Sequence, residues 1–226
     1  SVNDADSLIV LAKAFKNDLL RWGIPQPIHL LTTKVNDELL NGFDFSTKQW
    51  GPNILFLTRI ETYKGIFITL EAFLSIKSKI PSASLTIAGN GTKLNLAKKF
   101  VNDNNLQGVD FLGNISGNKL IETFSKASIY ILPSYSEGMP TSVLEAMAFG
   151  LPIISRPVGG LVDFFEEGKM GFLIKSFESK EYEEKLCYLI ENQVKRKEMG
   201  KYNYEYAKKH FMASKVAKDI EKVLLK

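Results

Sequence analysis

Short apolar segments alternate with helical segments along most of this chain, and this alternation is the strongest constraint on its fold. The apolar segments are uninterrupted, which is typical of strands buried on both faces. Between them, apolar residues recur at helical spacing, as Ile66, Leu70 and Phe73 do. This order predicts a doubly wound α/β fold with a parallel sheet. The expected strands cover residues 8–11, 28–32, 54–58, 84–88, 109–112, 128–132, 152–155 and 171–174. The expected helices cover residues 65–80, 92–104, 117–126, 140–149 and 160–167, and only helical patterning follows residue 177.

The chain divides into unequal regions. Residues 33–52 have few periodic apolar residues and end at Gly51-Pro52, which predicts a linker. The unit before this linker has one strand, one helix and one strand, which is too little to form a core alone. It therefore packs on the main domain or belongs to a second domain that is absent. Because the chain enters a strand directly after Ser1, we expect a fragment.

The composition is that of a globular protein, with 45% hydrophobic and 24% charged residues among 226. The formal net charge of +4 permits an anionic ligand or an acidic membrane surface and requires neither. The single cysteine, Cys187, cannot form an internal disulfide and indicates a reducing compartment. No apolar segment approaches the roughly 18 residues that cross a bilayer. We therefore expect a cytoplasmic protein.

Residues 133–150 contain two glutamates, Glu137 and Glu145, with seven residues between them. Glu137 follows an apolar strand in a loop, and Pro140 suits the first position of a helix that carries Glu145. The N–H groups at the start of this helix favour an anion, and the carboxylates beside it accept hydrogen bonds from hydroxyl groups. This combination suits a sugar attached to a diphosphate.

Two cations and two glycines follow neighbouring strands of the main unit. Arg59 and Lys64 lie after its first strand, and the ligand crevice of a doubly wound sheet lies at the carboxyl ends of the strands. Such cations are often solvated surface residues, but beside the glutamate pair they favour phosphate binding. Gly89 and Gly91 resemble the start of a dinucleotide fingerprint, yet Leu94 stands where the third glycine would be. We therefore expect a tight turn that lets a ligand approach the backbone.

With these motifs in this order, the chain resembles the carboxyl-terminal half of a retaining GT-B glycosyltransferase of family 4 (glycosyl transferases group 1). The resemblance covers residues 52–195. It is carried by Thr58-Arg59, Lys64-Gly65, Ala88-Gly89-Asn90-Gly91, Phe111-Leu112-Gly113, the glutamate pair, Leu151-Pro152-Ile153-Ile154 and Val158-Gly159-Gly160. It implies a Rossmann-like domain at 51–200, preceded at 1–50 by the tail of a missing amino-terminal domain plus linker. It also implies C-terminal helices at 201–226 that cross to that missing domain.

The resemblance also implies a role for individual residues. Arg59 and Lys64 would bind the donor diphosphate, and these two with Glu137, which would bind the sugar hydroxyls, form the expected catalytic set. Glu145 would hold the ribose, and the backbone of Ile115 would meet the base. The remaining donor-binding residues are Gly89, Gly91, Gly138, Met139, Pro140 and Thr141. A UDP-sugar is the favoured donor, with no cofactor and no metal. The pattern Asp4-Ala5-Asp6 matches a metal-binding motif of some glycosyltransferases, but its place before a strand favours solvated acids.

The implied partners are the donor and a glycan or lipid-linked acceptor, bound through the missing domain, and no nucleic acid. Peripheral contact with the inner face of the cell membrane and a homodimer of the isolated half stay open. The docking face should carry surplus apolar surface, with Leu11, Phe15 and Trp22 as candidates. Two other functions stay open: a non-catalytic module that binds a nucleotide sugar or a partner, and a GT-B nucleotide-sugar epimerase.

Overall fold

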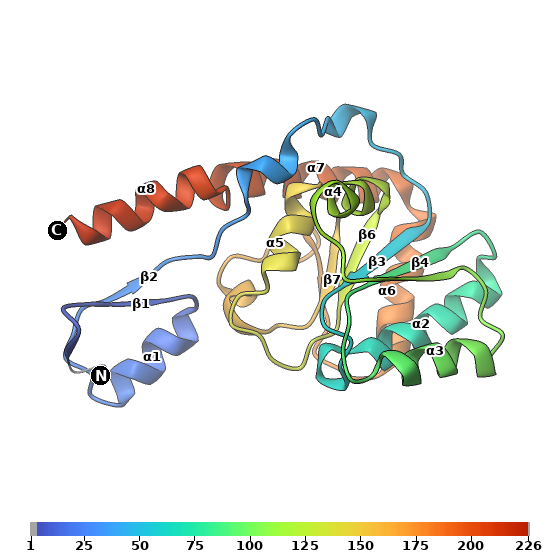
Figure 1. Cartoon of the computed structure of the whole chain (residues 1–226), viewed down its shortest axis with the longest axis horizontal. Coiled ribbons are helices and arrows are strands. Elements are labelled where there is room, and N and C mark those ends of the chain that lie inside the picture. Colours follow the sequence, from blue (N-terminus) through green and yellow to red (C-terminus); the bar gives the residue numbers. More distant parts are fainter. Residues whose placement is uncertain (1–3, 226) are drawn as a thin grey trace.

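The computed structural model describes residues 4–225 and has a parallel six-stranded sheet at its centre (Figure 1). The strand order is β5-β4-β3-β6-β7-β8, so the direction of winding reverses between β3 and β6. This arrangement confirms the predicted doubly wound α/β fold. The strands are β3 (Asn53–Leu57), β4 (Ser84–Ala88), β5 (Val109–Gly113), β6 (Ile129–Leu132), β7 (Ile153–Ser155) and β8 (Gly171–Leu173).

Helices cover both faces of this sheet (Figure 1). One layer contains α2 (Ile66–Lys79), α3 (Leu94–Asp103) and α6 (Ser179–Glu191), and the other contains α4 (Gly117–Lys126), α5 (Thr141–Ala148) and α7 (Gln193–His210). Short 3-10 turns lie at η2 (Asp37–Leu40), η3 (Phe45–Thr47), η4 (Thr62–Lys64) and η5 (Gly159–Asp163). In residues 4–225, no helix has the length and apolar character needed to span a membrane.

The predicted strands and helices lie within two residues of the observed ones, with one exception. The helix predicted at 160–167 is wrong, because only η5 is helical there and it is a 3-10 turn. Gly159 adopts a left-handed φ of +53° and starts this turn. The chain then turns toward β8, and just before this strand the Met170 N–H donates to the Glu166 carbonyl at 2.9 Å.

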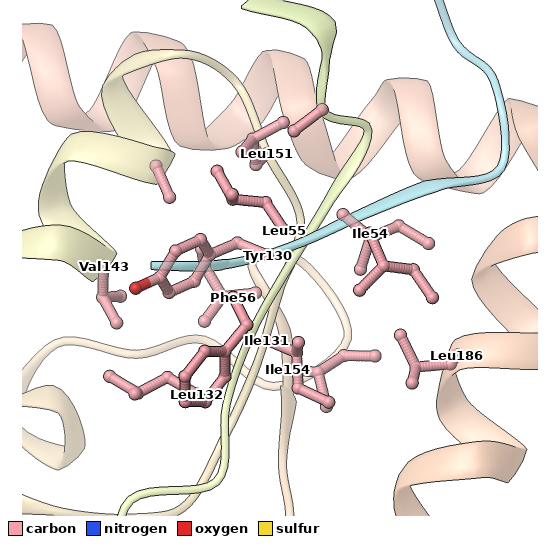
Figure 2. Packing of buried hydrophobic residues seen from close by; sticks show 14 of the residues in the cluster. Ile54, Leu55, Phe56, Tyr130, Ile131, Leu132, Val143, Leu151, Ile154 and Leu186 are labelled. Atoms are coloured by element: carbon pink, nitrogen blue, oxygen red, sulfur yellow. The ribbon is translucent and has the colours of Figure 1, made fainter. Parts of the chain in front are cut away.

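The core lies between the sheet and its two helical layers (Figure 2). All four residues of β6 are buried, because this strand lies between β3 and β7 and under helices on both faces. Full burial of each large aliphatic or aromatic side chain stabilises the fold by about 1.5–3 kcal/mol. Figure 2 shows the one polar atom among these labelled side chains, the Tyr130 hydroxyl, pointing toward α5.

The leading residues form a separate small unit of β1 (Leu8–Val10), α1 (Lys13–Arg21) and β2 (Ile28–Leu30). It contacts the main domain through the start of α1, where the Lys13 N–H donates to Asp163 Oδ2 at 2.7 Å. Its surface is apolar in places, since Trp22 is 74% exposed and Phe15 is 38% exposed. A parallel pair of strands is too small to be stable alone, so it depends on neighbouring structure.

The chain returns to this small unit through α8 (Ala213–Leu224) (Figure 1). Val35 pairs with Met212 in an isolated bridge, and Asp37 accepts hydrogen bonds from the Ser214 N–H and hydroxyl, both at 2.8 Å. Asp37 thus satisfies a free donor at the start of α8. The helix α7 is continuous from Gln193 to His210, so the boundary drawn between residues 200 and 201 lies inside a helix.

The linker packs against the main domain through a buried lysine. Lys48 Nζ donates to the carbonyls of Phe124 and Ser125 at the end of α4, at 3.3 and 3.2 Å. The rings of Phe43 and Trp50 lie 5.9 and 5.6 Å from the ammonium group. Burial lowers the pKa of Lys48 from 10.5 to about 7. The linker is therefore an ordered part of the fold.

This burial predicts a pH-dependent contribution to stability. Between about pH 7 and 10.5 the unfolded chain binds a proton at Lys48 that the folded chain has lost, so the free energy of unfolding rises with pH there. The rise is at most about 1.4 kcal/mol per pH unit. In Lys48→Met this contribution should disappear, as urea unfolding at pH 7 and 9.5 will measure. The exposed Lys126→Met is the matched control. A stability difference between wild type and Lys48→Met that does not change with pH would contradict this account.

Candidate functional site

The loops after β3 and β6 bring Lys64 and Glu137 together at the carboxyl edge of the sheet. Lys64 Nζ donates to Glu137 Oε1 at 2.6 Å, and each side chain is only 11% exposed. This edge lies between β3 and β6, where the winding reverses, which is where doubly wound sheets form ligand crevices. The structure thus places two of the predicted site residues in direct contact.

A glycine allows this close approach. Gly65, at the start of α2, adopts a left-handed φ of +81°, and a Cβ atom there would lie 2.5 Å from the Pro133 carbonyl oxygen. The same loops are joined by hydrogen bonds to the Tyr63 carbonyl, from the Tyr135 N–H at 2.8 Å and the Ser134 hydroxyl at 3.3 Å. Any larger residue at position 65 would therefore force the loops apart.

The second glutamate, Glu145, lies on α5. Burial raises the pKa of Glu145 to about 7. The Tyr130 hydroxyl donates to the Leu57 carbonyl at 2.8 Å and lies 2.7 Å from Ser142 Oγ. Burial raises the pKa of Tyr130, and the charges of Glu145 and Glu137 raise it further. Both glutamates thus raise the pKa of one buried hydroxyl, which stays protonated and joins the end of β3 to the start of α5.

Sequence reasoning did not find Tyr130. The only signal was a tyrosine within an otherwise aliphatic strand, at residues 129–132. A buried tyrosine needs a partner for its hydroxyl, and this need points toward a polar region at the strand end.

The loop before α5 is fixed from the other side by η5. The Gly160 N–H donates to the Gly138 carbonyl at 2.7 Å, and a Cβ atom on Gly159 would lie 2.1 Å from the same oxygen. Pro140 is the residue before the helix and not its first residue, because α5 begins at Thr141. The loop that carries Glu137 nevertheless leads directly to α5, with Gly138, Met139 and Pro140 between Glu137 and the first helical residue.

A cavity of about 250 Å³ lies along the ends of β3, β4 and β5, and its lining includes neither Lys64 nor the two glutamates. Its lining includes three predicted residues, Arg59, Gly89 and Ile115. Arg59 is exposed, and its guanidinium lies 5.7 Å from the ring of Tyr63. The cavity therefore has a cation at one end and backbone groups along its wall.

The two predicted glycines of this region serve close packing of the backbone. A Cβ atom on Gly89 would lie 2.0 Å from the Thr58 carbonyl oxygen, and one on Gly91 would lie 2.3 Å from that of Ile60. The loops after β3 and β4 are thus in contact. Gly89 lines the cavity, whereas Gly91 is not among its lining residues.

Other residues considered in the sequence lie outside this site. Among residues 4–225, no three His, Cys, Asp or Glu side chains are grouped as metal ligands. His210 packs on the ring of Tyr206 at 4.4 Å, and burial lowers its pKa. Burial raises the pKa of the Cys187 thiol, which disfavours the reactive thiolate. The site thus offers two cations, two carboxylates and backbone groups, which together can bind an anionic, hydroxyl-rich ligand.

Comparison with known proteins gives a consistent family. The family model described as glycosyl transferases group 1 matches residues 43–206. An uncharacterized glycosyltransferase of Methanocaldococcus jannaschii is 29% identical, with 99% of this chain and 60% of the relative covered. The trehalose synthase of Pyrococcus horikoshii is 32% identical, with 78% of this chain and 44% of the relative covered. The chain thus spans 60% or less of the length of these two relatives.

Two solved structures share the fold. The Anabaena protein HepE, in complex with UDP-glucose, matches with a TM-score of 0.83 and 18% identity, over 99% of this chain and 65% of that one. The pneumococcal O-GlcNAc transferase GtfA, in complex with UDP and GlcNAc, matches with a TM-score of 0.81 and 20% identity, over 97% and 45%. These likenesses establish a GT-B glycosyltransferase fold. Because the family model covers most of its length, this chain belongs to the glycosyl transferases group 1 family.

Proposed function

We propose that this chain is the donor-binding, carboxyl-terminal half of a retaining, metal-independent family 4 glycosyltransferase, which transfers a hexose from a nucleotide-diphosphate sugar. The single observation that carries the proposal is the contact between Lys64 and Glu137 at the carboxyl edge of the sheet. It joins a phosphate-binding cation and a hydroxyl-binding carboxylate at one point. A sugar diphosphate also carries both kinds of group close together, because one bridging oxygen joins the phosphate to the anomeric carbon and hydroxyl groups are attached to the other ring carbons.

The charges of the site suit the breaking of the glycosidic bond. As the bond breaks, negative charge develops on the departing diphosphate, and the two cations Arg59 and Lys64 stabilise it there. Glu137, released from Lys64 by the competing phosphate, accepts hydrogen bonds from the sugar hydroxyls. The backbone from Gly138 to Thr141 holds the sugar and phosphate. These steps require no metal ion.

The nucleoside would lie in the cavity beside the diphosphate. Glu145 accepts hydrogen bonds from the ribose hydroxyls, and the base lies along Gly89 and Ile115. UDP is the favoured nucleotide, because both solved relatives named above are complexes with UDP or UDP-glucose. This support comes from the relatives, since backbone contacts alone select no base.

The acceptor would be a glycan or a lipid-linked glycan held by a second domain. The curated relatives are longer than this chain, and apolar side chains are exposed on the small unit, which supports docking of further structure there. Residues 1–50 then form the end of that domain plus the linker, and residues after 200 cross back to it. Peripheral contact with a membrane would place such an enzyme beside a lipid-linked acceptor.

Calorimetric titration with UDP, GDP and ADP, without metal, tests the donor site. We expect one nucleotide, UDP, to bind wild type, and Arg59→Ala/Lys64→Ala to weaken binding at least 100-fold, since each charged hydrogen bond contributes on the order of 1.5–3 kcal/mol. Arg21→Ala/Lys99→Ala removes two exposed cations elsewhere and should leave the affinity unchanged. If the folded wild-type chain binds none of the three, the alternative of a partner-binding module takes precedence.

The pKa of Glu145 predicts how donor affinity depends on pH. The free carboxyl group is protonated below about pH 7, and only the ionised form is a strong acceptor for the ribose hydroxyls. The affinity for UDP-glucose, whose phosphate esters do not titrate in this range, should therefore rise several-fold from pH 6 to 8. In Glu145→Gln the affinity should be lower at pH 8 and independent of pH. If wild type and variant show the same pH dependence, Glu145 does not contact the donor.

A further inference from the structure

Arg156 bridges two loops at the carboxyl edge of the sheet. It is not one of the residues proposed to contact the donor. It follows β7 directly, and its guanidinium carbon lies 3.7 Å from the ring centroid of Phe177 and 5.9 Å from that of Tyr135. The two rings meet edge to face at 4.6 Å. Its Nη2 donates to the Lys175 carbonyl at 2.9 Å. One side chain thus connects the segment after β8 to the loop after β6.

The position of this guanidinium is unfavourable in one respect. Its Nε atom is buried and has no hydrogen-bond acceptor among the described residues. A buried donor without a partner lowers stability, while stacking of the planar guanidinium on two rings raises it. Stability alone therefore gives an incomplete reason for an arginine at this place, and such local conflicts are typical of functional positions.

The bridged loop leads directly to the donor site. Tyr135 stands two residues before Glu137, and its N–H donates to the Tyr63 carbonyl at 2.8 Å. The ring of Tyr63 in turn lies 5.7 Å from the Arg59 guanidinium and 5.6 Å from Lys64 Nζ. Since Tyr135 is 41% exposed, it has limited packing of its own. Its contacts with Arg156 and Phe177 therefore limit where the Glu137 loop can lie.

We propose that Arg156 is a positioning residue for the sugar end of the donor site, acting through Tyr135 on Glu137 and Lys64. The inference rests on the proposed function, because it concerns the same site. The role of Arg156 predicts a difference between two classes of ligand. A ligand that extends to Glu137 depends on Arg156, whereas a ligand that ends at the first phosphate depends on the cavity and Glu145.

The test compares UDP-glucose with UMP by calorimetry. Arg156→Ala and Phe177→Leu should each lower the affinity for UDP-glucose on the order of tenfold, which is the size expected from loss of a cation–π contact. The affinity for UMP should change by less than about twofold. Phe177→Tyr, which keeps the ring, should bind like wild type. Lys175→Ala removes a neighbouring cation but keeps the carbonyl that Arg156 contacts, so it should also leave both affinities unchanged.

The outcomes separate this inference from the proposed function. A wild-type chain that binds no UDP-glucose counts against the proposed function alone. The rate of hydrogen exchange at the Tyr135 amide then tests, without a ligand, whether Arg156 holds the loop in place. Faster exchange in Arg156→Ala than in Lys175→Ala supports a positioning role, and equal exchange overturns it. Where UDP-glucose does bind, an unchanged affinity in Arg156→Ala, or equal losses for UDP-glucose and UMP, also overturns it.

Discussion

The close approach of the loops after β3 and β6 is the constraint on which the rest of the site depends. The sheet winds in opposite directions from these two strands, so their carboxyl ends form the edge of a crevice. Gly65 lets the backbones touch, and the Tyr63 carbonyl accepts hydrogen bonds from the opposite loop. The contact between Lys64 and Glu137 follows from this approach. A residue with a Cβ atom at position 65 would separate the pair even if both charged residues remained.

The two glutamates have different environments, and this difference fits different tasks. Glu137 is paired with a cation, whereas Glu145 lies in a half-buried place on α5 where burial raises its pKa to about 7. Tyr130 supplies a neutral hydroxyl, because burial raises its pKa and the charges of the two carboxylates raise it further. One carboxylate is thus held in place before a ligand arrives, and the other becomes a strong acceptor only above neutral pH. This division supports a ligand with a charged part and a hydroxyl-bearing part.

The sheet, the helical layers and the placement of Lys64 and Glu137 at one edge of the sheet could be predicted from the sequence, because buried parallel strands and strand-end residues leave clear local patterns. The direct contact between Lys64 and Glu137 was not predicted. The prediction of a helix at 160–167 was wrong, because the apolar pattern there does not reveal that Gly159 adopts a left-handed conformation. Tyr130 and Arg156 were missed for another reason. Their roles come from contacts with residues distant in sequence, such as Leu57 and Phe177, and only the folded chain shows these. The site roles of the donor residues stay predictions.

The most direct test of the central claim is a crystal structure of this chain with UDP-glucose. The account predicts the diphosphate within hydrogen-bonding distance of Arg59 and Lys64, and the sugar hydroxyls on Glu137. It also predicts that Lys64 moves from Glu137 toward phosphate, because the diphosphate carries the greater charge. A nucleotide sugar bound away from the carboxyl ends of β3 and β6, with the contact between Lys64 and Glu137 unchanged, would contradict it.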